Sequence, residues 1–65
     1  MLEVDQILLA EKFQKLLDQE RQAEQVYGEL ADKIADLTAR QQLQQIRREK
    51  IHHMELIQRL LEIVD

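Results

Sequence analysis

The chain has 65 residues, which limits it to one small domain, and it contains no Cys, which excludes disulfides and thiolate metal ligands. Its formal net charge of −4 argues against nucleic-acid binding, and no apolar run approaches the roughly 20 residues that span a bilayer. With no Pro and one Gly, the composition favours helix. Since the start of the chain does not read as a signal peptide, we expect an all-α protein of the cytoplasm.

The first predicted element is a helix over about residues 5–35. Apolar residues recur along it at intervals of three and four, which is typical of a helix with one buried face. Only Gly28 interrupts the pattern, at a cost of ~1 kcal/mol relative to Ala. The stripe consists of Leu9, Phe13, Leu16, Leu17, Ala23, Tyr27, Ala31 and Ile34.

A turn at residues 36–38 and a second helix over about residues 39–64 follow. Thr38 and Gln41 have the spacing of a capping box that opens this helix. Because the turn is short, the two helices are expected to pack as an antiparallel hairpin. The apolar positions of the second helix are Leu43, Ile46, Leu56, Ile57, Leu60 and Ile63.

A hairpin of this size needs further stabilisation, because each of its helices has only one face to bury. Disulfides are excluded, which leaves a bound metal, self-association or both. We therefore expect residues 1–65 to form a single helical-hairpin domain. Two copies of this domain would pair as a homodimeric four-helix bundle, alone or as a multiple of such dimers.

Two acidic residues lie within the predicted apolar stripes. Glu20 falls within about 20° of the centre of the first stripe, and Glu49 lies between Ile46 and Leu56 on the second. His52 follows Glu49 at i+3, on the same side of the helix. If the turn is centred near residue 36, these three residues converge. A two-fold axis then gives four carboxylates and two imidazoles, the ligand set of di-iron carboxylate bundles.

Other readings of these residues stay open. Glu20 and Glu49 could instead form ion pairs, but the nearby arginines, Arg40, Arg47 and Arg48, are expected to project away from the stripe. His53 lies about 40° from Glu49 and is the alternative to His52 as a ligand. Glu24 is a further candidate ligand or a solvated flank, and Tyr27 is a core aromatic or a hydrogen-bonding or redox residue beside the metal.

The segment Glu20–Tyr27 followed by Glu49-Lys50-Ile51-His52 resembles the ferritin-like superfamily. Rubrerythrins have a similar Glu-x6-Tyr on one helix and Glu-x-x-His on the next. The single pair in this chain is most similar to the encapsulated ferritins, two-helix chains that dimerise to complete a ferroxidase centre.

This resemblance implies two iron ions per dimer, bound by Glu20, Glu49 and His52, and oxidation of ferrous iron. Manganese and zinc fit the same donors. The resemblance also implies an encapsulin shell as a partner, although the sequence carries no shell-targeting peptide. The acidic residues that flank the first ligand in encapsulated ferritins are replaced here by Gln19, Arg21 and Gln22. The rival hypothesis is a non-catalytic hairpin module that dimerises or carries metal.

Overall fold

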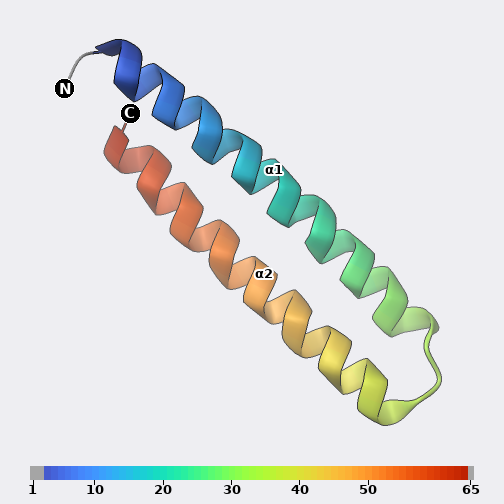
Figure 1. The fold of residues 1–65 in the computed structure, drawn as a ribbon. Helices are drawn as coiled ribbons and strands as arrows, with labels where there is room; N and C mark the ends of the chain where they lie inside the picture. The colour runs from blue at the N-terminus through green and yellow to red at the C-terminus, as the bar shows by residue number, and fades with distance from the viewer. Residues whose placement is uncertain (1–2, 65) are drawn as a thin grey trace.

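The fold is a hairpin of two long helices. The computed structural model describes the backbone of residues 3–64 and the side chains of residues 5–64. Helix α1 spans Glu3–Lys33 and helix α2 spans Leu37–Val64. The helices run antiparallel, so the start of α1 and the end of α2 lie together, with the turn at the opposite end (Figure 1). The Cα positions extend 52 × 14 × 11 Å. The predicted all-α hairpin is confirmed.

The turn lies two residues earlier than predicted, at residues 34–36. The carboxylate of Asp36 accepts a hydrogen bond from the backbone N–H of Ala39 at 2.8 Å, which makes Asp36 the N-cap of α2. The predicted capping box at Thr38 is therefore wrong, because Thr38 already lies in the first turn of the helix. An aspartate at the N-cap also places a negative charge at the positive end of the helix dipole.

A guanidinium group closes the end of α1. Arg40 donates from Nε and Nη2 to the carbonyl oxygen of Ile34, at 3.2 and 2.7 Å. This carbonyl lies just beyond α1, where backbone acceptors lose their helical partners. Arg40 was expected to project away from the apolar stripe, and its guanidinium joins the end of one helix to the start of the next.

The face of α1 that contacts α2 repeats every seven residues. One series of positions begins at Ala10 and the other at Phe13, and every member of both is buried or half-buried. This period is typical of two helices packed by interlocking side chains. The series are Ala10, Leu17, Glu24 and Ala31, and Phe13, Glu20, Tyr27 and Ile34, the last of which directly follows α1. We call these positions, together with the buried and half-buried residues of α2 that face them, the seam.

Helix α2 contacts α1 through part of the predicted face, since Leu43, Ile46 and Ile57 are buried or half-buried as expected. Its buried and half-buried positions include Leu43, Ile46, Lys50, Met54, Ile57, Leu61 and Val64. Leu56, Leu60 and Ile63 were predicted to lie in the same stripe, but their side chains are exposed, Ile63 by 77%. Helix α2 thus has two adjacent apolar stripes, about 100° apart on the helix. Only one of them is covered by α1.

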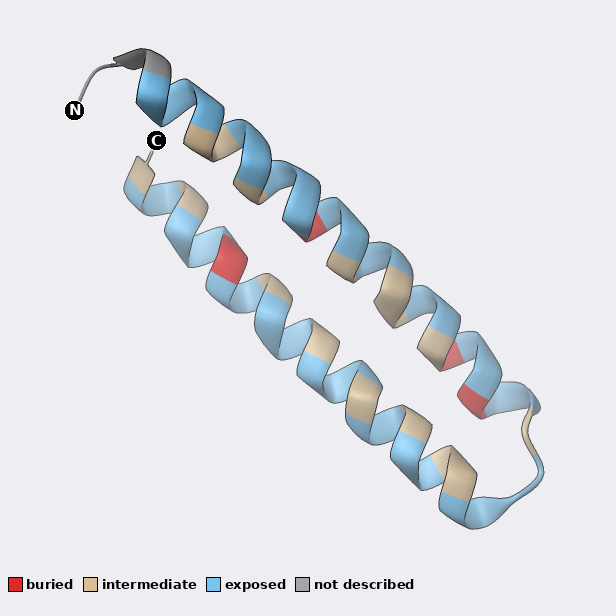
Figure 2. Cartoon of the chain, viewed as in Figure 1, coloured by how far each residue is buried: buried red, intermediate tan, exposed pale blue. Residues whose placement is uncertain are grey.

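The core between the two helices is small. Among the described residues only Leu17, Ala31 and Ile57 are buried apolar side chains, and Figure 2 shows the buried and half-buried positions. The chain exposes 5227 Å² of surface, whereas a compact monomer of 7.8 kDa exposes about 4,400 Å². The hairpin therefore exposes roughly 800 Å² more than a compact protein of its mass. Neither described helix has the apolar length needed to cross a membrane.

Candidate functional site

Glu20 lies at mid-length of the hairpin and faces α2. Its side chain is 18% exposed, and both of its carboxylate oxygens lie 3.4 Å from Lys50 Nζ. His53 Nδ1 lies 3.4 Å from Glu20 Oε2. The prediction that Glu20 belongs to the inner face of α1 is confirmed, and its partners within one chain are Lys50 and His53.

Glu24, one turn further along α1, has a cation of its own. Arg47 Nε donates to Glu24 Oε1 at 2.6 Å, and the Glu24 carboxylate raises the pKa of the Arg47 guanidinium, first by this hydrogen bond and then by its charge. Gly28 gives the arginine space, because a Cβ on this residue would lie 3.3 Å from Arg47 Nε. Arg47 was expected to project away from the stripe, and it instead lies across α1.

A shallow cavity of about 410 Å³ surrounds this ion pair. It is lined by Glu24, Gln25, Gly28, Glu29, Asp32 and Arg47. Since the guanidinium already pairs with Glu24, the remaining carboxylates of the cavity belong to Glu29 and Asp32, both exposed. This arrangement is an ion pair with solvated neighbours. It offers no set of donors that converge on one point.

Glu49 and His52 do not meet Glu20 within one chain. Glu49 is exposed and accepts a hydrogen bond from Gln45 Nε2 at 3.3 Å. His52 is also exposed, with Nδ1 4.0 Å from the Glu55 carboxylate. Among the residues that the structure describes, no group of three acidic, His or Cys side chains is close enough to hold a metal ion. Any site that uses Glu20 and Glu49 together therefore needs a second chain or a rearrangement.

Lys50 is the residue that the sequence analysis missed. It lies seven residues after Leu43 and seven before Ile57, so the period of the seam places it facing α1. Tyr27, the other residue proposed near a metal, is half-buried in the same seam of α1.

One broad side of the hairpin is apolar and uncovered. In an antiparallel pair of helices, consider the residue directly before each seam position in the sequence. On both helices these residues point to the same broad side of the hairpin. On α1 these are Leu9, Leu16, Ala23 and Leu30, and on α2 they are Gln42, Glu49, Leu56 and Ile63. We call this side, with the adjacent Ile46, His53 and Leu60, the open face.

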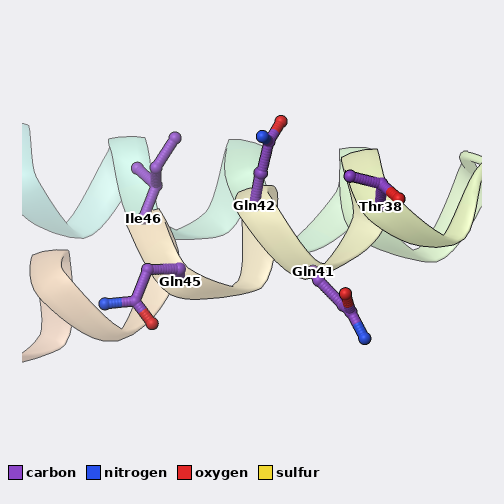
Figure 3. Close-up of a pocket in the computed structure, with 5 residues that line it drawn as sticks. All are labelled: Thr38, Gln41, Gln42, Gln45 and Ile46. Atoms are coloured by element: carbon purple, nitrogen blue, oxygen red, sulfur yellow. The ribbon is translucent and has the colours of Figure 1, made fainter.

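The open face continues into a shallow cavity of about 500 Å³ at the turn end of α2. Its lining residues are Thr38, Gln41, Gln42, Gln45 and Ile46 (Figure 3). In Figure 3 the side chains of Gln42 and Ile46 project to one side of α2, and Gln41 to the other. None of the five side chains is an acid, a base or a strong nucleophile. The cavity therefore presents hydroxyl, amide and apolar groups.

No protein-family model, curated protein or solved structure matches this chain. The described residues form a two-helix hairpin with an ionic middle around Glu20 and an uncovered, largely apolar side.

Proposed function

We propose that two copies of the chain pair through the open face, bind two iron ions at the centre of the resulting four-helix bundle and oxidise ferrous iron there. The main support for this proposal is the pair of polar side chains at the middle of the open face. Glu49 and His53 interrupt its apolar residues at the level of Glu20, and Glu20 already contacts His53.

The surface of the hairpin supports pairing with a second copy. A stable protein interface takes about 800 Å² from each partner, and the hairpin exposes roughly that much more than a compact protein of its mass. The open face has apolar residues on both sides of Glu49, with Gln42 near the turn, and it is polar at mid-length. Two hairpins aligned over their whole length therefore bring apolar residues onto apolar residues, and the middle of one copy onto the middle of the other.

The donors of two copies fit iron in type and number. Carboxylate and imidazole are ligands that iron accepts, and the chain has no thiolate to favour a softer metal. Glu20 and Glu49 would hold the ions and balance their charge, and His53 would complete the coordination. His53 is preferred to His52 because it contacts Glu20. The two ferrous ions would together give up two electrons and become ferric. With two protons, these electrons would reduce one O2 to hydrogen peroxide, or one hydrogen peroxide to water. Leu56 and Leu60, which lie on the same face, would limit access of water in the dimer.

Anaerobic titration of the untagged protein with ferrous iron tests this proposal. We expect about two ions per dimer, the stoichiometry of di-iron bundles, followed by oxygen uptake when air is admitted. Glu49→Ala and His53→Ala should each lose most of the bound iron. His52→Ala should retain it, and so should Glu62→Ala, which removes an exposed carboxylate of α2. Full iron binding by both Glu49→Ala and His53→Ala would refute the site.

A second candidate is a dimerisation module without metal, which the ion pair between Glu20 and Lys50 favours. In this case Glu20 is already balanced by a lysine, and the polar middle of the hairpin fixes how two copies align. The same titration separates the candidates, because the module would remain dimeric and bind no iron.

A further inference from the structure

We infer that Lys50 is an internal counter-ion of Glu20 that an incoming metal ion must displace, so that this lysine stabilises the metal-free protein and weakens metal binding. The inference rests on the proposed metal site and adds to it a residue that controls its occupancy.

The geometry places the ammonium group and a metal ion in competition for the same carboxylate. Lys50 Nζ lies 3.4 Å from both oxygens of Glu20, which are the atoms that a metal ion bound by this residue would need. An ammonium group and a divalent cation both carry positive charge, and they repel each other when they share one carboxylate. Occupation of Glu20 by metal therefore favours departure of the ammonium group.

Lys50 is placed so that it can leave. Its side chain is 26% exposed, and four methylene groups separate its charge from the backbone. The stem can stay against the seam while the ammonium group moves into water. Lys50 occupies a position of the seam whose neighbours at seven residues, Leu43 and Ile57, are apolar. The pairing with Glu20 explains why a charged residue is present at this position.

The neighbouring ion pair offers a matched control. Arg47 and Glu24 form an ion pair between the same two helices. This pair lies one helical turn nearer to residues 34–36, which connect the helices. Arg47 lies against Gly28, which follows a seam position and is therefore on the side opposite the open face. Its removal should affect the stability of the hairpin but not the proposed metal site.

The experiment compares wild type with Lys50→Met, Lys50→Arg and Arg47→Met. Thermal unfolding is measured without metal and with saturating ferrous iron, and affinity is measured by anaerobic calorimetry with ferrous iron. Without metal, Lys50→Met should melt below wild type, because Glu20 loses its cation. Its affinity for iron should rise by up to about fivefold, the scale of one partly exposed ion pair. With saturating iron the two melting temperatures should therefore converge, because the pair is absent from both metal-bound proteins.

Two control variants, Arg47→Met and Lys50→Arg, separate the role of Lys50 from general effects on stability. Arg47→Met should melt lower without metal and keep the wild-type iron affinity. Lys50→Arg should bind iron no more tightly than wild type, because its charge remains, and it serves if Lys50→Met does not fold. Equal iron affinity in wild type and Lys50→Met overturns the role of Lys50 and leaves the proposed iron site standing. Absence of iron binding in every protein overturns both proposals.

Discussion

Three glutamates near the middle of the hairpin differ in what surrounds them. Glu20 and Glu24 face the seam, and each is paired with a cation from α2. Glu49 is on the open face, and its hydrogen-bond partner among the described residues is the neutral Gln45. Pairing of two copies would remove Glu49 from water without supplying a cation, which is costly for a carboxylate. A metal ion would remove this cost.

Replacement of Glu49 by Leu should separate stability from function at this residue. The leucine extends the apolar surface formed by Ile46, Leu56 and Leu60, so the metal-free dimer should gain on the order of 1–2 kcal/mol. Iron oxidation should be lost. Chemical denaturation without metal, together with oxygen uptake on iron addition, measures both effects. Glu62→Leu is the control, and it should change neither quantity by much. A destabilised Glu49→Leu dimer would indicate that Glu49 has a cationic partner across the interface.

At the level of the helices, the composition was sufficient to predict two helices and one short turn. The ends of the helices were less certain, because Asp36 and Thr38 are both residues that cap helices well. Only the three-dimensional course of the chain decides which side chain reaches a free backbone N–H. Asp36 does so at Ala39.

The faces of α2 were harder to predict than its length. Two apolar stripes about 100° apart overlap on a helical wheel and read as one broad stripe. Glu49 therefore appeared to be buried against α1, although Lys50 occupies that position. The seven-residue spacing of Leu43, Lys50 and Ile57 was the signal that distinguishes the stripes. The contact of Glu20 with His53 depends on the register of the two helices, which a single sequence leaves open.

The cap of α2 gives a prediction at this scale. Asp36→Ala should destabilise the protein by about 1 kcal/mol, because the N–H of Ala39 loses its acceptor and the helix dipole loses a negative charge. Thr38→Ala should have a much smaller effect, since Thr38 is exposed in the first turn of α2. Chemical denaturation of the two variants tests the assignment. A larger loss in Thr38→Ala than in Asp36→Ala would contradict it.

At the scale of the whole molecule, the hairpin exposes a large surface and buries few apolar side chains. With three buried apolar side chains among the described residues and exposed Leu56, Leu60 and Ile63, one hairpin leaves much apolar area in water. Association through the open face would cover this area and make folding depend on protein concentration.

We expect a dimer, or a multiple of it, at micromolar concentration. Leu56→Lys should disrupt it, because the charge would be buried within the interface. Ile51→Lys is the matched control, because Ile51 is an exposed apolar residue of the same helix outside the open face, and this variant should stay dimeric. Sedimentation velocity distinguishes these outcomes. A folded wild-type monomer at micromolar concentration would exclude the shared site.

The link between Arg40 and the carbonyl of Ile34 has a consequence for the order in which the hairpin forms. This contact joins residues only six apart, and the cap at Asp36 joins residues three apart, whereas Glu20 and Lys50 are separated by 30. Closing a short loop costs less entropy than closing a long one. The turn should therefore form first, and helix pairing should advance from it as a zipper. Amide hydrogens near the start of α1 and the end of α2 would then exchange with solvent fastest, with protection increasing toward the turn.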